Sequence, residues 1–352
     1  MRGRGDRLEQ LLAEAELDRY LVTDLTNVRY LTGFTGTNGV CVCGPSVRLF
    51  LTDFRYTERA AAEVEGWESE TLTGDWLKGI GARLQGRVGF EDDEMSVRLL
   101  GKLKEKLGDE TEMVAAGGKV QDLRRVKDAE ELAAIEEASK LSDAVWHWTL
   151  EQGLAGRRER DVAQAAEARI RELGAEPSFP AIVAAGPNGA LPHAEPGERE
   201  IGRGELVVFD MGAKLDGYCS DGTRTFATGD PGEEGGEVYE VVRRSQAAAL
   251  EAIRAGVKGE DPDSAARQLI DDAGYGEHFG HALGHGVGLE VHEGPRLSQR
   301  SDDLLAPGEV VTVEPGVYLP GKLGVRIEDL VVVSEDGLRN LSSLPKELQI
   351  VD

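Results

Sequence analysis

The chain has 352 residues, of which 40% are hydrophobic and 30% are charged, a balance typical of folded globular proteins and not of disordered chains. Its 40 Lys and Arg residues stand against 65 Asp and Glu residues, which gives a formal net charge of −25. An acidic surface repels phosphate backbones, and the sequence holds no basic run with interleaved aromatic residues, so we expect no binding to nucleic acid.

The start of the chain shows no pattern of a targeting segment. The basic stretch Met-Arg-Gly-Arg-Gly is followed by Asp6 and Glu9 instead of an apolar segment. No run in the sequence approaches the ~18 apolar residues of a membrane span. Cys41, Cys43 and Cys219 are too few and too scattered for a disulfide framework. We therefore expect reduced thiols, a cytoplasmic location and no membrane association.

Residues 1–118 alternate short apolar runs with helical patterns, which predicts an α/β domain. The apolar runs at 20–22, 39–43, 47–51 and 88–90 predict strands, and the patterns at 57–64 and 96–107 predict helices. The small residues at 115–118 mark a boundary. We expect a smaller N-terminal domain of residues 1–118 and a catalytic domain of residues 119–352.

The second segment opens with a long helix. Asp128 can cap it, and Glu131 stands three residues later as in a capping box. A second helix is expected over 160–173, before Gly174. From residue 205 onward, strands and Gly-rich turns are interrupted by helical stretches near 241–255 and 263–273. This pattern predicts an α+β domain with a mainly antiparallel sheet.

Two aspartates stand on a predicted hairpin. The pair Asp216-Gly217 is a strong signal for a type I′ turn between two strands. If the strands pair directly across it, Gly212 lies opposite Asp221, and Asp210 becomes its diagonal neighbour at roughly 7–8 Å. An isolated pair in so acidic a chain would be read as solvent-facing. Two like charges on a half-buried sheet instead need raised pKa values or a cation between them.

Four of the six histidines lie within fifteen positions. The surrounding glycines make a regular helix unfavourable there, and they favour close approach of the main chain, so this is no HExxH zinc helix. The four are His278, His281, His285 and His292.

Two glutamates stand at the ends of predicted strands. Glu314 follows the run Val310-Val-Thr-Val, and Glu328 precedes an equally apolar run. A carboxylate in such a setting is unusual unless it is paired or binds a metal. The two-residue period places Arg326 on the same face as Glu328 and turns Asp329 to the opposite face.

Together these residues suggest a metal centre. Oxygen-rich ligation with a single imidazole favours Mn²⁺, with Co²⁺ and Zn²⁺ as alternatives. Four anionic ligands exceed what one divalent ion needs, so we expect two ions ~3.5–4 Å apart that share an activated water, and hydrolysis as the reaction class. The candidate ligands are Asp210, Asp221, His285, Glu314 and Glu328.

The order of these motifs resembles the pita-bread metallopeptidases: prolidase, aminopeptidase P, methionine aminopeptidase and the metal-free creatinase. The shared pattern is an Asp, an Asp eleven positions later, Gly-His-Gly-Val-Gly, Glu-Pro-Gly and Arg-Ile-Glu-Asp. The resemblance implies that Asp210 is a terminal ligand of one metal and that Asp221 and Glu328 bridge both. It also implies that His285 and Glu314 bind the other metal, and that Glu314 moves a proton.

Further motifs resemble the prolidase and aminopeptidase P branch, which also has an N-terminal α/β domain. They are Leu191-Pro-His-Ala194, His281, His292, Arg326-Ile-Glu328 and the stretch 30–36. The resemblance implies that His193 and His292 meet the scissile carbonyl or its oxyanion. It also implies that His281 and Arg326 line the proline side and that the protein is a homodimer. Gly222 departs from the larger apolar residue usual in relatives, and we expect looser packing there.

The leading hypothesis is a dinuclear-metal exopeptidase that cleaves the Xaa-Pro bond of dipeptides or short peptides with proline second. The alternative is an aminopeptidase P that releases the residue before proline from longer peptides. A metal-free binding protein on the same fold is a third reading, which retention of all five ligands argues against. A creatinase-like amidinohydrolase is disfavoured because it does not need these acids.

Overall fold

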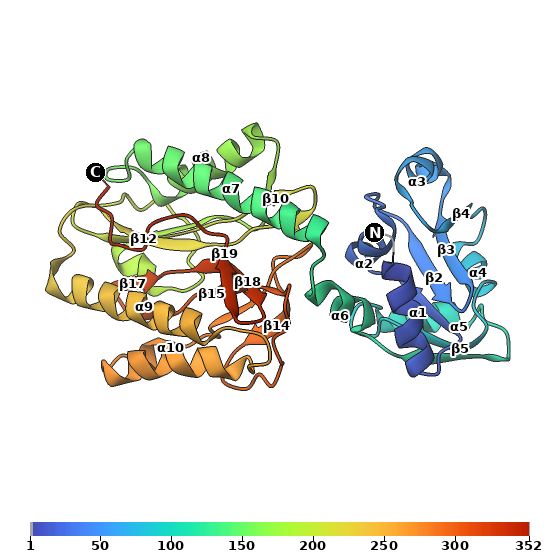
Figure 1. Ribbon diagram of the computed structural model, residues 1–352. Coiled ribbons are helices and arrows are strands. Elements are labelled where there is room, and N and C mark those ends of the chain that lie inside the picture. Colours follow the sequence, from blue (N-terminus) through green and yellow to red (C-terminus); the bar gives the residue numbers. More distant parts are fainter. Residues whose placement is uncertain (1–2, 352) are drawn as a thin grey trace. The chain divides into compact units, whose positions relative to one another are not determined.

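The protein, seen in a computed structural model that describes residues 3–351, has two compact units that divide between Arg124 and Arg125 (Figure 1). Met1 and Arg2, the first residues of the basic start, lie outside the described residues. The boundary expected after residue 118 stands before this division, at the start of helix α6 (Lys119–Arg125). Its Arg124 donates a 2.7 Å hydrogen bond to the side chain of Asn27, which ties the helix to the first unit.

The first unit is an α/β domain around one mixed sheet. Central pairs are antiparallel from β1 to β2 and from β2 to β3, whereas β1–β5, β3–β4 and β5–β6 are parallel. In sheet order the strands are β4 (Glu68–Thr71), β3 (Val47–Thr52), β2 (Val40–Gly44), β1 (Arg19–Val22), β5 (Gly86–Phe90) and β6 (Thr111–Ala115). The helices are α1 (Arg4–Glu14), α2 (Leu25–Thr32), η1 (Phe54–Tyr56), α3 (Thr57–Glu63), α4 (Trp76–Gly81) and α5 (Val97–Lys104).

The four predicted strands of this unit are confirmed, and two more strands were not predicted. The additional strands, β4 and β6, are the two edges of the sheet. Neither contains a fully buried residue, so neither carries the apolar pattern that marks a strand. Helix α5 begins as expected after Ser96, whose hydroxyl accepts a hydrogen bond from the Leu99 amide.

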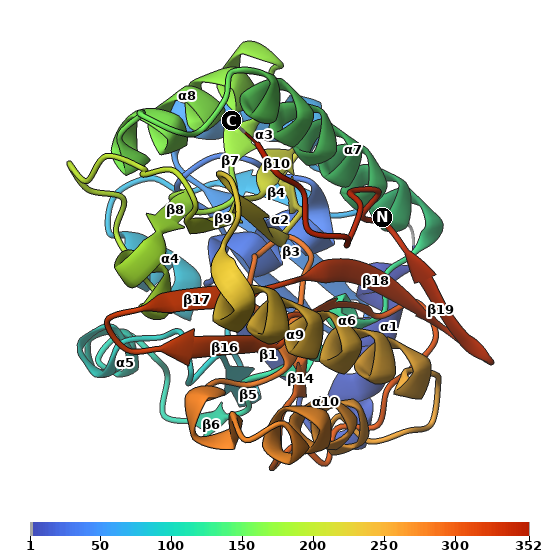
Figure 2. The same cartoon turned by 90° about the vertical axis from the view of Figure 1, so that its left-hand side faces the viewer.

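The second unit packs small antiparallel sheets between two pairs of helices, with α7 and α8 on one side and α9 and α10 on the other (Figures 1 and 2). The helices are α7 (Ala129–Glu151), α8 (Glu159–Glu172), η2 (Gly186–Ala190), α9 (Gly232–Ala252), α10 (Glu260–Asp272) and η3 (Gly276–His278). The strands are β7 (Glu176–Pro177), β8 (Ile182–Ala185), β9 (Leu206–Asp210), β10 (Ala213–Leu215), β11 (Tyr218–Cys219), β12 (Thr223–Ala227), β13 (Gly284–Gly286), β14 (Glu293–Leu297), β15 (Val310–Val313), β16 (Gly316–Leu319), β17 (Leu323–Arg326), β18 (Asp329–Ser334) and β19 (Gly337–Asn340).

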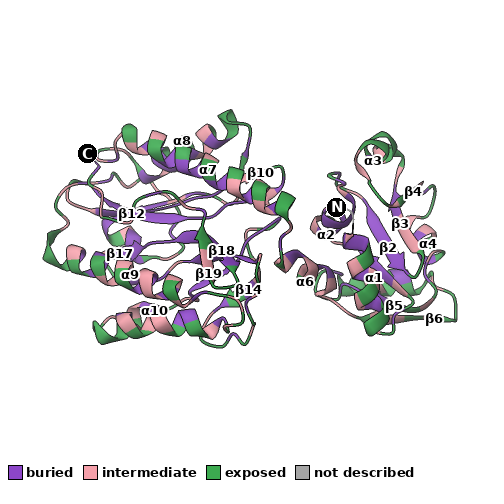
Figure 3. Cartoon of the chain, viewed as in Figure 1, coloured by how far each residue is buried: buried purple, intermediate pink, exposed green. Residues whose placement is uncertain are grey.

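Burial follows these layers. The strands in the middle of the second unit are buried, and the helices turn exposed faces outward (Figure 3). The strands of this unit pair in antiparallel fashion, which confirms the predicted α+β architecture. Among the described residues, no helix combines the length and the hydrophobicity that crossing a membrane requires.

The hairpin register is confirmed. Asp216 and Gly217 both have positive φ, 47° and 85°, as a type I′ turn requires. Leu215 pairs with Tyr218 in the hairpin, and beyond an interruption Asp210 pairs with Thr223 in the same register. This register brings Asp210, the last residue of β9, and Asp221, which precedes β12, to one region of the unit.

Two predicted helices of this unit show how local signals succeed and fail. At α7, Asp128 and Glu131 form the complete capping box. The prediction for α9 is wrong at its start, because the helix begins at Gly232 rather than near residue 241. The glycines and acids of its first turns hide the pattern, but Val238 and Tyr239 there are buried in the core.

Candidate active site

One cavity of the second unit gathers the residues that the sequence singled out. Its volume is about 550 Å³, and it lies where β9, β13, β15 and β17 end near the loop around residue 193. All nine predicted side chains line it: Asp210, Asp221, His285, Glu314, Glu328, His193, His281, His292 and Arg326.

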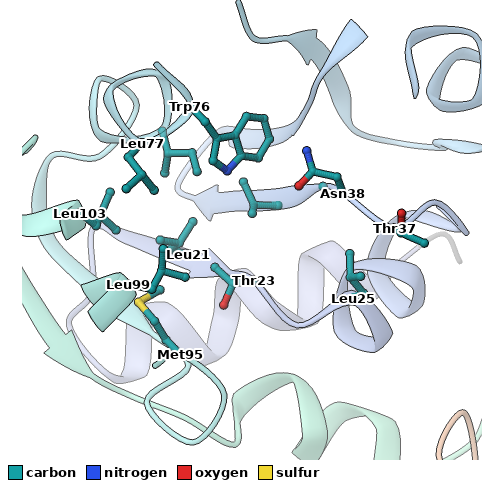
Figure 4. A pocket seen from close by; sticks show the side chains of 13 residues that line it. Leu21, Thr23, Leu25, Thr37, Asn38, Trp76, Leu77, Met95, Leu99 and Leu103 are labelled. Atoms are coloured by element: carbon teal, nitrogen blue, oxygen red, sulfur yellow. The ribbon is translucent and has the colours of Figure 1, made fainter. Parts of the chain in front are cut away.

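A second pocket, in the first unit, has a different character. It is smaller, about 200 Å³, and its lining is mostly aliphatic, with Trp76 and Met95 and the polar side chains of Thr23, Thr37 and Asn38 (Figure 4). No acidic, basic, histidine or cysteine side chain is among the residues that line it. This pocket therefore lacks the groups that hydrolytic chemistry needs.

The core of the site is a triad of possible ligands. Asp221, His285 and Glu328 each offer one ligand atom, and these atoms all lie within 4.8 Å of one another. Each comes from a different place: Asp221 precedes β12, His285 is in β13, and Glu328 stands between β17 and β18. All three residues are at least 91% buried, with exposures of 9%, 9% and 2%.

The imidazole of His285 presents an unprotonated nitrogen to this centre. Its Nδ1 lies 3.0 Å from the carbonyl oxygen of Gly286, which can only accept, so Nδ1 carries the proton. Burial lowers the pKa of His285 to about 4, which keeps the ring neutral. The free Nε2 then lies 3.4 Å from Glu314 Oε1 and 3.7 Å from Asp221 Oδ2. A lone pair that faces two carboxylate oxygens is unfavourable unless a proton or a cation lies between them.

Arg326 and Thr223 hold the other carboxylates. The Arg326 guanidinium donates to Asp210 Oδ2 at 2.5 Å and to the Thr223 hydroxyl at 3.0 Å. That hydroxyl in turn donates to Glu328 Oε2 at 2.8 Å. The second oxygen of Asp210, Oδ1, is buried and has no hydrogen-bond partner among the described residues.

The electrostatics of the cavity call for added positive charge. Burial raises the pKa of Glu314 to about 8 and also raises the pKa of Asp210, which Arg326 opposes. Burial and then the neighbouring acids raise the pKa values of Asp221 and Glu328 well above their usual range. Among the described residues, Arg326 is thus the one guanidinium that acts on these four carboxyls, of which Glu314 is partly exposed and the other three are buried. Divalent cations would neutralise them and satisfy the orphaned oxygen of Asp210, so the residues present fit a metal centre.

The remaining predicted residues surround these carboxylates. His292 packs edge-on against His285, with ring centroids 4.4 Å apart. His193 is exposed at the cavity wall, and the preceding Pro192 carbonyl accepts a 3.1 Å hydrogen bond from Arg326. His281 Nε2 lies 2.9 Å from the Tyr318 hydroxyl.

Two site residues were missed by sequence reasoning. Tyr318 links His281 to Arg326, whose guanidinium donates to its hydroxyl at 3.0 Å. Thr223 joins Arg326 to Glu328 as described above. A signal existed for Thr223, because it stands two residues after Asp221 and thus on the same face of the ribbon. No local pattern marks Tyr318, because its role depends on the pairing of β16 with β17.

The expectation of loose packing at Gly222 is wrong. A Cβ atom added there would lie 2.7 Å from the ring of Trp146. Trp146, 3% exposed, thus fills the space that a larger side chain would occupy beside Asp221.

Comparison with known proteins shows the family to which this metal-binding type of site belongs. Residues 133–335 match metallopeptidase family M24, and residues 4–126 match the creatinase/prolidase N-terminal domain. The chain is 41% identical to the uncharacterized peptidase YqhT of Bacillus subtilis (strain 168), over 98% of this chain and 99% of that one. Two solved structures are similar over the whole chain. An Xaa-Pro dipeptidase from Bacillus anthracis is 38% identical, with a TM-score of 0.96 and 99% of both chains covered.

The second is an X-Pro aminopeptidase from Thermotoga maritima MSB8. It is 36% identical, with a TM-score of 0.91, and the likeness covers 98% of this chain and 100% of that one. The chain therefore belongs to metallopeptidase family M24, with a creatinase/prolidase-type N-terminal domain and the pita-bread fold, and it is a peptidase whose family uses divalent metal ions.

Proposed function

We propose that the protein is an Xaa-Pro dipeptidase that works with two divalent metal ions, Mn²⁺ by preference and Co²⁺ or Zn²⁺ as alternatives. The observation that carries the proposal is the convergence of five ligand side chains and four further polar side chains on one cavity. The likeness to an Xaa-Pro dipeptidase over the whole chain supports the substrate class.

The ligands in this proposal are Asp210, Asp221, His285, Glu314 and Glu328. Their carboxylate oxygens and single imidazole suit borderline and hard divalent ions, and four acids suit two ions better than one. Bound ions would supply an activated water and polarise the scissile carbonyl.

The chain's own residues have separate tasks in the proposed reaction. Glu314, whose Oε1 lies 3.4 Å from His285 Nε2, is the acid that takes up and passes on a proton in this proposal. In this proposal His193 and His292, which line the cavity, donate hydrogen bonds to the carbonyl oxygen. His281 and Arg326 form the wall against which the proline ring is placed. A tertiary imide nitrogen has no hydrogen to donate, so recognition by ring shape suits this bond.

Peptide length defines the second candidate function. The likeness to an X-Pro aminopeptidase is nearly as extensive as that to the dipeptidase, so an aminopeptidase that shortens longer peptides is the alternative. The two activities share the same chemistry at the metals and differ in whether the cavity accepts residues after proline.

Hydrolysis of three peptides tests the proposal. Enzyme stripped with chelator and restored with Mn²⁺, Co²⁺ or Zn²⁺ is given Ala-Pro, Ala-Pro-Ala and Met-Ala-Ser. We expect metal-dependent cleavage before proline, faster for Ala-Pro, and no cleavage of Met-Ala-Ser. Faster cleavage of Ala-Pro-Ala would select the aminopeptidase, and no cleavage with any metal would select the metal-free binding protein.

We also propose that the enzyme is a cytoplasmic homodimer. The three cysteines are free and buried, which suits a reducing compartment. Light scattering of the purified protein would give the mass of the assembly, and a monomer under assay conditions would refute the dimer.

A further inference from the structure

Helix α10 carries a buried ion pair on the side that faces the loop before β13. Asp263 and Arg267 are four residues apart, and the Arg267 guanidinium donates hydrogen bonds to both carboxylate oxygens of Asp263, at 2.9 and 3.0 Å. The Asp263 side chain is fully buried, and that of Arg267 is 14% exposed. Such a pair is costly to bury unless its remaining hydrogen-bonding groups are satisfied.

The other hydrogen bonds of this pair go to the main chain of the loop 279–283. Arg267 donates to the carbonyl oxygens of Phe279, at 2.8 Å, and His281, at 3.0 Å. Asp263 accepts a 3.1 Å hydrogen bond from the amide of Leu283. Three alternate residues of one irregular segment are thus held by a single pair of side chains.

The aromatic rings of this loop are held as well. The Arg267 guanidinium stands over the Phe279 ring, 4.0 Å from its centroid. Phe279 packs edge-on against the His281 ring at 5.1 Å. His281 Nε2 meets the Tyr318 hydroxyl, as described above, and Tyr318 meets Arg326. The loop is therefore fixed on one side by α10 and presents His281 to the cavity on the other.

The same loop also reaches a candidate ligand. The carbonyl oxygen of Leu283 accepts a 2.8 Å hydrogen bond from the amide of Glu314. The Leu283 amide is the group that Asp263 holds. A shift of the loop would consequently move the ring of His281 and the main chain at Glu314 together.

We propose that Asp263 and Arg267 are positioning residues of the active site, which set the loop 279–283 so that His281 stands against the proline side of the substrate. The inference rests on the proposed function for the task of His281. The geometry requires arginine, because one planar fork serves a bidentate carboxylate and two carbonyls, which a lysine ammonium cannot reproduce.

The test compares paired variants in the metal-loaded full-length enzyme. Arg267→Met removes the fork, and Arg267→Lys keeps only its charge. Because an unpaired buried Asp263 can impair folding, the double variant Asp263→Leu/Arg267→Met removes both charges together, a change that buried ion pairs often tolerate. The matched control is Arg243→Met on α9, since Arg243 forms a bidentate pair with Glu240 that is exposed and touches no site residue.

Two readouts separate positioning from mere stability. The first is the ring signals of the six histidines in protein labelled at histidine, with His281 assigned through His281→Gln and the exposed His147 of α7 as internal reference. The second is kcat/KM for Ala-Pro, measured together with bound metal. For the Met, Lys and double variants we expect displaced His281 signals and a fall in kcat/KM of about tenfold or more when the rate is counted per metal-loaded site, with the control unaffected.

The outcomes are decisive in each combination. Unchanged His281 signals, or kcat/KM within twofold of wild type, would overturn the proposal even if stability falls. Full rescue by Arg267→Lys would also overturn it, because charge alone would then suffice. If the wild-type enzyme cleaves no Xaa-Pro peptide, the proposed function fails, and the His281 signals alone decide whether the pair positions the loop.

Discussion

The imidazole of His285 lies close to two acidic side chains of the site. Its protonated nitrogen is committed to a backbone carbonyl, and its free nitrogen faces Asp221 and Glu314. A neutral lone pair and two buried carboxylates repel one another unless protons or cations intervene. Ligand acids and neighbouring histidines should therefore respond differently to substitution.

For the acids, Asp221→Asn and Glu328→Gln should lose bound metal and Ala-Pro hydrolysis together, because each removes an anionic oxygen from the centre. His292→Ala should keep the metal, because its ring packs on His285 without being one of the five ligands. Turnover should fall about 10²–10⁴-fold, because the variant lacks the proposed hydrogen-bond donor to the carbonyl oxygen. Elemental analysis and steady-state kinetics measure both quantities. A fully active Asp221→Asn enzyme would mean that the site is assigned wrongly.

Packing beside the ligands gives a second prediction at this scale. Gly222→Ala places a Cβ 2.7 Å from the Trp146 ring, so we expect a loss of about 1–3 kcal/mol in the free energy of unfolding. Gly236→Ala in α9 is the control: nothing lies within 4 Å of its Cβ, and helix propensity should make it neutral or stabilising. Thermal melts compare the two. Equal melting temperatures would show that the Trp146 ring can move aside without a loss in the free energy of unfolding.

At the scale of elements, Glu91 joins two parts of the first unit. Its carboxylate, at the end of β5, accepts hydrogen bonds from the amides of Thr23 and Asp24 and from the side chain of Asn27, at 2.6, 2.8 and 2.7 Å. It thereby connects the sheet to the start of α2. Burial raises the pKa of Glu91 to about 7, and the hydrogen bonds oppose this rise only in part.

The sign of the pH dependence follows from that shift. The folded-state pKa lies above the unfolded value near 4.5, so the folded state binds the proton more tightly. Local stability around α2 should be greatest below pH 4.5 and should fall, by about 3 kcal/mol at most, as pH rises through 7. Hydrogen exchange of peptides covering residues 19–32, corrected for intrinsic rates, measures it. Glu91→Gln should flatten this dependence, and a variant with the wild-type slope would exclude Glu91 as its source.

At the scale of the whole molecule, the formal charge of −25 dominates. Individual surface ion pairs, such as Lys322 with Glu234, contribute about 0–1 kcal/mol each and weaken with salt. The unbalanced negative charge repels itself throughout the surface, and salt weakens this repulsion too, since the screening length is ~10 Å at 0.1 M. With acids in such excess, relief of repulsion should exceed the loss of pairs.

We therefore expect the urea midpoint of unfolding to rise between 10 and 300 mM KCl, a range in which the screening length falls by roughly a factor of five. Equilibrium denaturation at fixed pH measures it, and the same titration in sucrose of matched osmolality separates screening from exclusion effects. A midpoint that falls with KCl would show that the surface ion pairs outweigh the net charge.

Local patterns sufficed for much of the fold and for the candidate ligands. The Asp216-Gly217 turn sets the register that aligns Asp210 with Thr223, because a two-residue turn leaves the strands no freedom to slip. The acids at 314 and 328 were recognisable because a charge in a β-branched run has few structural explanations. The edge strands β4 and β6 escaped notice because one-sided pairing leaves them without an apolar signature.

The sequence by itself determined the candidate metal ligands, the two-domain organisation and the antiparallel hairpin, since these depend on residue type and short-range periodicity. Only the tertiary structure decided that Tyr318 and Thr223 join the site, that Trp146 fills the space beside Gly222, and that α10 holds the loop of His281. These contacts link segments far apart in the chain, and their energies depend on burial and exact distance, which no local pattern encodes.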